Sequence, residues 1–179
     1  TMNSKNIVSV ADPVNAQDAA TKNYVDSVAQ GLDVKPSVLA ATTGTLATAS
    51  GGSTSYNNGT SGVGATITTT GTYTTIDSIS IATVGTRVLV KNESNAAWNG
   101  IYTYTSSTVL TRSTDFDTGT EMAGGFIFVE QGSTLSDTGW VCTTDSPITV
   151  GTTNINFSQF SGAGTYAAGT GLTLTGTTF

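Results

Sequence analysis

Residues 87–105 read RVLVKNESNAAWNGIYTYT, and this stretch decides the fold class. Arg87 to Lys91 is a compact run centred on apolar, mostly β-branched residues, which is typical of a strand. Residues 101–105 alternate between large and hydroxyl side chains, as a half-buried strand does. Before the second strand, Asn99-Gly100 predicts a type I′ turn, because both residues readily adopt positive φ angles.

Similar short runs recur along the chain. They lie at residues 65–68, 76–81, 109–112, 126–130, 139–143 and 155–160. Roughly seven to nine short strands separated by turn residues predict an antiparallel β-sandwich or jelly-roll-like domain. No strand–helix–strand pattern occurs, so a parallel sheet is not expected. The alternation predicts buried side chains at Ile101, Phe126, Phe128 and Phe157.

Residues 42–64 are rich in threonine, serine, glycine and asparagine and have little periodicity. Gly51-Gly52-Ser53 and Asn57-Asn58-Gly59 are typical turn sequences. This segment is therefore expected to be either a surface loop or a loosely paired edge hairpin.

A helix is expected ahead of the β domain, from Ala16 to Gln30, because this range contains no glycine or proline. Asn15 can accept an unpaired amide of the first turn as an N-cap, and the carboxylate of Asp18 favours the positive helix end. Gly31 is a natural stop.

The apolar residues of this helix form a narrow stripe. Thr21, Val25, Val28 and Leu32 have the spacing of a coiled-coil seam, and Ala20 and Tyr24 widen it. A lone helix of about fifteen residues is marginal in water, so the stripe needs a cover. Two covers fit the pattern, the chain's own sheet or the same helix from other chains, and we favour other chains.

Several segments resemble the tail fibre proteins of tailed bacteriophages. Residues 5–26 resemble the linker-and-helix motif that recurs in these fibres, and residues 31–38, 87–92 and 98–102 resemble the β domain that often follows it. Residues 162–166 and 169–174 resemble a glycine-rich joint to a next fibre domain. The resemblance implies a homotrimer whose chains meet along a helical stem. The residues expected at that interface are Ile7, Val10, Ala20, Thr21, Tyr24, Val25, Val28 and Leu32.

Three parts are expected along the chain. Residues 1–34 form an extended arm and the trimerising helix, residues 35–161 the β-sandwich domain, and residues 162–179 the joint. Because the pattern is interrupted at Phe179, the natural polypeptide is expected to continue.

The composition disfavours several classes of partner. The net charge is −6 and the six basic residues are scattered, which disfavours nucleic acid. No apolar run approaches the roughly 18 residues of a membrane span, and no signal-peptide pattern is present.

Catalytic and metal sites are not indicated either. The chain has no histidine and a single cysteine, Cys142, so a zinc site, another metal site or a cofactor is not expected. Cys142 alternates within a strand and is expected to be a small buried residue. Asp115, Asp117 and Glu121 could form half of a calcium loop or a glycosidase acid pair. We favour turn-capping roles for them, facing Arg112, and the same roles for Glu130 and Asp137.

The aromatic residues give one further alternative. Trp98, Tyr102 and Tyr104 could stack on sugars if two of them were exposed and coplanar, although core packing is the commoner use of such residues.

The resemblance predicts a non-enzymatic structural segment of a virion tail fibre, linking the virion to a distal receptor-binding tip through tail or baseplate proteins. The alternative is a receptor-binding module that contacts host surface polysaccharide. A polysaccharide depolymerase is disfavoured because no acid pair stands out.

Overall fold

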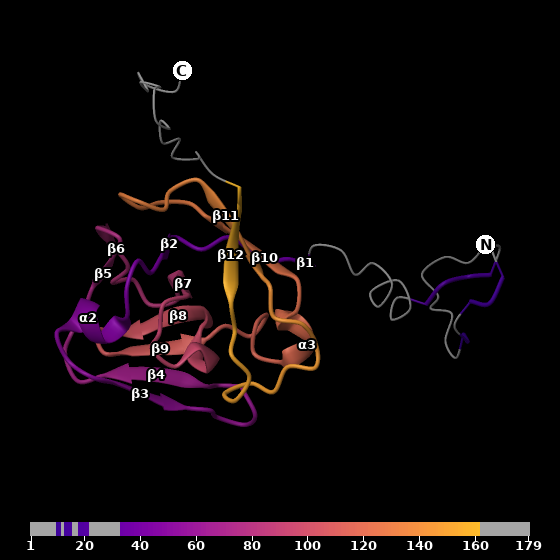
Figure 1. The fold of residues 1–179 in the computed structure, drawn as a ribbon, viewed down its shortest axis with the longest axis horizontal. Helices are drawn as coiled ribbons and strands as arrows, with labels where there is room; N and C mark the ends of the chain where they lie inside the picture. The colour runs from indigo at the N-terminus through magenta and orange to yellow at the C-terminus, as the bar shows by residue number, and fades with distance from the viewer. Residues whose placement is uncertain (1–9, 12, 16–17, 22–32, 162–179) are drawn as a thin grey trace, which may run out of the picture. The chain divides into compact units, whose positions relative to one another are not determined.

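The computed structural model describes residues 10–11, 13–15, 18–21 and 33–161 (Figure 1). The chain divides into two compact units, residues 1–31 and 32–179. In the first unit the carboxylate of Asp18 accepts hydrogen bonds from the backbone amides of Val14 and Asn15, at 3.0 and 2.8 Å. The expected helix is wrong over residues 18–21, which are not helical, and the rest of the range 16–30 lies outside the described residues.

The second unit is mainly β and contains two larger sheets. The four-stranded sheet has the order β1-β10-β11-β12. Its strands are β1 (Asp33–Val34), β10 (Gly125–Val129), β11 (Thr138–Cys142) and β12 (Phe157–Ser161). The six-stranded sheet has the order β2-β7-β8-β9-β4-β3. Its strands are β2 (Ala40–Ala41), β3 (Thr54–Asn57), β4 (Thr66–Thr69), β7 (Arg87–Val90), β8 (Gly100–Ser106) and β9 (Val109–Arg112).

Smaller elements fill the connections. They are α2 (Leu46–Ser50), the hairpin β5 (Thr75–Ile76) and β6 (Ile79–Ser80), the 3-10 helix η1 (Ala96–Trp98), and α3 (Gly119–Met122). The weakly patterned region 42–64 thus holds α2 and the edge strand β3, which pairs with β4 as an antiparallel hairpin. Thr45 caps α2 by accepting the amide of Thr48 at 3.1 Å.

The sheets are mixed rather than purely antiparallel. β1 pairs with β10, and β2 with β7, in parallel. Neither sheet is a parallel sheet, but the expected antiparallel arrangement is wrong at these two pairs, because the first strands of the unit pair with strands formed much later in the chain. Asp33 and Val34, expected in the arm, belong to the β unit for the same reason.

Residues 33–42 tie the two sheets together. The amides of Lys35 and Val38 donate to carbonyls of β10, both at 2.9 Å, and the amides of Leu39 and Thr42 donate to carbonyls of β7, both at 2.9 Å. One short segment therefore changes sheets and fixes the edge of a sandwich-like fold.

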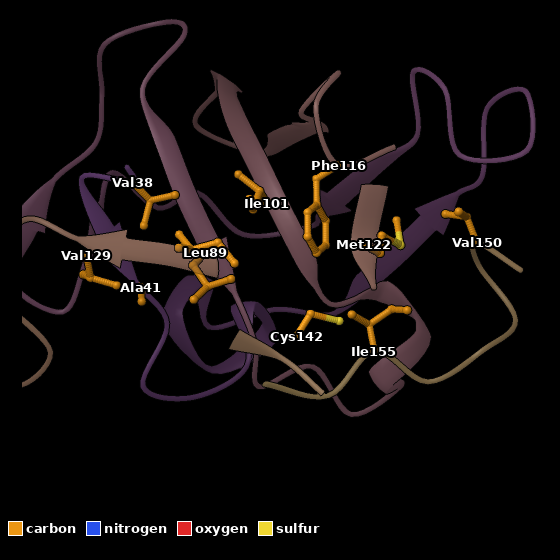
Figure 2. Close-up of a cluster of buried hydrophobic side chains, with 11 residues drawn as sticks. Val38, Ala41, Leu89, Ile101, Phe116, Met122, Val129, Cys142, Val150 and Ile155 are labelled. Atoms are coloured by element: carbon orange, nitrogen blue, oxygen red, sulfur yellow. The ribbon is translucent and has the colours of Figure 1, made fainter. Parts of the chain in front are cut away.

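The main core lies between the two sheets. It combines Ile127 and Val129 of β10 with Leu89 and Ile101 of the six-stranded sheet, and Phe116 points into it beside Met122 and Cys142 (Figure 2). The burial expected for Ile101 and Cys142 is confirmed.

A second core covers the other face of the six-stranded sheet. Val88, Val90, Tyr102 and Leu110 pack there beneath Leu46 of α2. Because both faces of this sheet are covered, Val88, Leu89 and Val90 are all fully buried and the strand reads as a continuous apolar run.

Two predictions from local sequence are wrong. Asn99-Gly100 is not a hairpin turn, because η1 ends at Trp98 and Gly100 already begins β8. The side chain of Asn99 instead accepts the amide of Glu93 and donates to the carbonyl of Ile155, both at 3.0 Å. Phe128 is 39% exposed rather than buried, and Phe126 and Phe157 are half-buried. The core face of β10 carries Ile127 and Val129.

Asp77 fastens the β5–β6 turn to the loop between β10 and β11. Its carboxylate accepts the amides of Thr134 and Leu135, at 3.0 and 2.8 Å, and the hydroxyl of Ser133 at 2.9 Å. Burial opposes the ionisation of Asp77, but these hydrogen bonds outweigh it and hold the pKa of the carboxyl below its usual value.

Candidate functional site

The stem interface expected from the sequence is only partly described. Val10, Ala20 and Thr21 are described, and Val10 and Ala20 are exposed in the single chain. The other residues expected there, Ile7, Tyr24, Val25, Val28 and Leu32, lie outside the described residues.

The structure does not bring the expected sugar-stacking residues together on the surface. Tyr102 and Tyr104 lie on one face of β8, as expected, but that face is buried in the second core. They cannot present rings to a glycan, which corrects their assignment. Trp98 is half-buried and stacks on Tyr56, with ring centroids 5.6 Å apart and planes 15° apart.

Arg112 occupies the space beside these rings. It is 2% exposed and donates to the carbonyl of Asn99 at 3.1 Å and to the hydroxyl of Tyr56 at 3.3 Å. Its guanidinium carbon lies 4.8 Å from the ring centroid of Tyr102. Neutral carbonyls and aromatic faces therefore contact this charge and stabilise it. No described carboxylate forms a salt bridge with Arg112, although its charge acts on Asp117.

The carboxylates of the Asp115 region have structural partners. Asp115 does not face Arg112 as expected but forms a bidentate pair with Arg87, at 3.0 and 2.9 Å. Arg112 acts instead on Asp117, whose ionised form its positive charge favours. Glu121 accepts the amides of Asp117 and Thr118, at 3.2 and 3.0 Å, and so caps α3 as expected. Asp117 is buried, and burial together with the negative charge of Glu121 raises the pKa of its carboxyl.

Glu130 and Asp137 flank the β10–β11 connection. The hydroxyl of Ser37 donates to Glu130, and the backbone amide of Asp137 donates to the carbonyl of Val129 at 2.9 Å. In the described parts of the chain, no cluster of three or more acidic, cysteine or histidine side chains could hold a metal ion. None of the described helices has the length and apolarity to cross a membrane.

A polar pocket of about 310 Å³ lies beside the β3–β4 connection. Its lining includes Asn58, Ser61, Thr118 and Thr149. Asn58 also accepts the hydroxyl of Tyr56 at 2.9 Å and so links the pocket to the Tyr56–Trp98 stack, although neither ring lines the pocket.

The most unusual surface is the outer face of the four-stranded sheet. Register places Val34 opposite Phe126, Phe126 opposite Val141, and Val141 opposite Ser158, so one row of side chains crosses all four strands on this face. Phe128 follows Phe126 on the same face. We call the apolar members of this surface the aromatic face: Val34, Phe126, Phe128, Val141 and Phe160.

Three members of the aromatic face, Val34, Phe128 and Phe160, are exposed, and Phe126 and Val141 are half-buried. Val34 is 68% exposed and Phe160 66%. The ring of Phe160 meets that of Phe126 edge-on, with centroids 5.8 Å apart. Gly139 makes this possible, because a Cβ there would lie 2.7 Å from the Phe126 ring. The sequence pattern did not lead us to expect this surface. Residues 126–129 are all apolar, and such a run indicates that both faces of the strand carry apolar side chains.

The chain enters and leaves the β unit along this same sheet. β1 and β12 are its two edge strands, and the pairings make both run in the direction of β10. The first residue of β1, Asp33, pairs with Gly125 at the start of β10. The last residue of β12, Ser161, pairs with Gly139, which in turn pairs with Phe128 near the end of β10. The incoming and outgoing ends therefore lie at opposite ends of the sheet.

Comparison with known proteins does not add a family. The chain matches no family model, no curated protein and no solved structure.

Proposed function

We propose that this chain is a structural segment of a bacteriophage tail fibre, which links the virion to a distal receptor-binding tip and holds three chains in register. The observation that carries the proposal is the path of the chain through the four-stranded sheet. Many domains have neighbouring termini, but here β1 and β12 run in the same direction along opposite edges. A unit of this kind joins one segment to the next in series.

The hydrogen bonding of the incoming segment supports a mechanical role. Residues 33–39 bond along β10, and residues 39–42 bond to β7. A load applied between Asp33 and Ser161 runs along the strands, so it shears several hydrogen bonds together. The fibre resemblance supplies the trimer, a stem formed by the chain ahead of the β unit, and the tail or baseplate partners.

Electron microscopy with gold-labelled antibody tests this proposal. Antibody raised against residues 33–161 should label a tail appendage at a fixed distance between the virion and the free tip. Labelling of the capsid, of the extreme tip alone, or of no virion structure contradicts it.

A second candidate is glycan binding near Trp98. The observation that favours it is the polar pocket that Asn58 links to the Tyr56–Trp98 stack, because sugars combine hydroxyl contacts with stacking on a nearby aromatic ring. A glycan array with the full chain tests it. Binding that is lost in Trp98→Ala and kept in Trp98→Phe supports this function, and absence of binding by the native chain contradicts it.

A further inference from the structure

The aromatic face gathers five apolar side chains on one face of a sheet, in a chain with a net charge of −6. Its members cross all four strands, from Val34 on β1 to Phe160 on β12. Contiguous exposed apolar surface of this kind marks an interaction site. The rings of Phe126 and Phe160 already hold each other in place, so a partner would meet a preformed surface.

We infer that the aromatic face packs against the same face of further copies of this chain, around an axis parallel to the β strands. The inference rests on the proposed function and adds a contact within the β unit to the expected helical stem.

Charge favours a second copy as the occupant. The chain carries a net charge of −6, so most pairs of surfaces on two copies repel each other. The aromatic face carries no ionisable side chain. Glu130, which directly follows β10, accepts a hydrogen bond from the hydroxyl of Ser37, and Asp33 is paired with Lys35 at 2.7 Å. Copies can therefore meet here with little like-charge repulsion.

The path of the chain also favours copies. Because the incoming and outgoing strands lie at the two edges of this sheet and run in the same direction, parallel chains can all turn the same face toward one axis. Closed cyclic symmetry uses one repeated surface in this way. Chains already held together in a fibre meet at a high effective concentration, so this contact does not need to be strong by itself.

Sedimentation equilibrium of the full chain tests the inference. The native chain should approach three times the 18.1 kDa of a single chain at high concentration. The triple variant Val34→Thr, Phe128→Thr, Phe160→Thr should raise the dissociation constant by at least about 30-fold, the effect of one strong interface side chain. The control is Val63→Thr with Val84→Thr, which changes valines that are 50% and 73% exposed elsewhere, and it should associate like the native chain.

Cysteine crosslinking locates the contact directly. Ser158 is exposed and lies opposite Val141 on the sheet, so Ser158→Cys should form chain–chain disulfides under mild oxidation. Ser55→Cys, at the exposed edge strand of the other sheet, should not. Cys142 is 3% exposed and adds little background.

Three outcomes overturn the inference. If the triple variant associates as strongly as the native chain, the chains meet through the stem and not through the aromatic face, and the proposed function is unaffected. A native chain that remains single at all concentrations, with no Ser158→Cys crosslink, would show that the face is covered by something else, such as residues 162–179. Crosslinking equal to that of Ser55→Cys would show random collision.

Discussion

Replacing Ile127 or its neighbour Phe128 on β10 with alanine should lower the free energy of unfolding by very different amounts. Ile127 is fully buried in the core between the sheets, whereas Phe128 points outward and is 39% exposed. Ile127→Ala removes buried methyl groups and leaves a cavity between two hydrogen-bonded sheets, so it should lower the free energy of unfolding by about 3 kcal/mol. Full burial of a phenylalanine side chain is worth about 1.5–3 kcal/mol. Phe128 is only partly covered and leaves no enclosed cavity, so Phe128→Ala should cost about 1 kcal/mol.

Equilibrium urea unfolding, followed by the fluorescence of Trp98 and Trp140, measures both changes. The measurements should be repeated over a tenfold dilution, because association through the aromatic face would add to the apparent loss at Phe128. A loss at Phe128 that equals or exceeds the loss at Ile127 in dilute solution would refute the reasoning. It would mean that β10 presents its other face to the core, since a shift of one residue exchanges the two faces of a strand.

Gly100 has a φ of +153° and a Cβ there would lie 2.1 Å from Nη1 of Arg112. Gly100→Ala should therefore lower the free energy of unfolding, measured in urea, by more than about 1 kcal/mol, whereas Gly44→Ala, with no atom within 4 Å, should not; equal effects would contradict this packing. The folded-state pKa of Asp77 is lowered, so its ionised form stabilises the fold above about pH 4 and that contribution is lost as the pH falls through the folded pKa. The free energy of unfolding should fall less steeply with decreasing pH in Asp77→Asn than in the native chain. An unchanged slope would show that the hydrogen bonds of the Asp77 carboxylate contribute little to stability. Burial raises the pKa of the Cys142 thiol, so a thiol reagent at neutral pH should label it only on unfolding; rapid labelling of the native chain would place it at the surface.

The strands themselves were predictable because their signal is local. β7, β9, β10 and β11 lie where compact or alternating apolar runs predicted them. The face that each strand buries was harder to predict. Residues 126–129 are apolar at both parities, so only the partner sheet decides that Ile127 and Val129 point inward.

Contacts between distant segments were not predictable from local patterns. The parallel pairing of β1 with β10 joins residues almost 100 positions apart, and nothing near Asp33 indicates its partner. Arg112 is the nearer arginine to Asp115 in sequence, but its guanidinium bonds to the carbonyl of Asn99, and it is Arg87 that forms the bidentate pair with Asp115. The predicted turn at Asn99-Gly100 does not form, because the side chain of Asn99 hydrogen-bonds to the backbone of Glu93 and Ile155 instead.

A three-dimensional reconstruction of the assembled appendage by electron cryomicroscopy tests the central claim most directly. The account predicts a β unit within the shaft, with Asp33 toward the virion, Ser161 toward the tip, and the aromatic faces of three copies turned to the axis. A unit attached sideways, with Asp33 and Ser161 on the same side and Phe160 facing solvent, would contradict it.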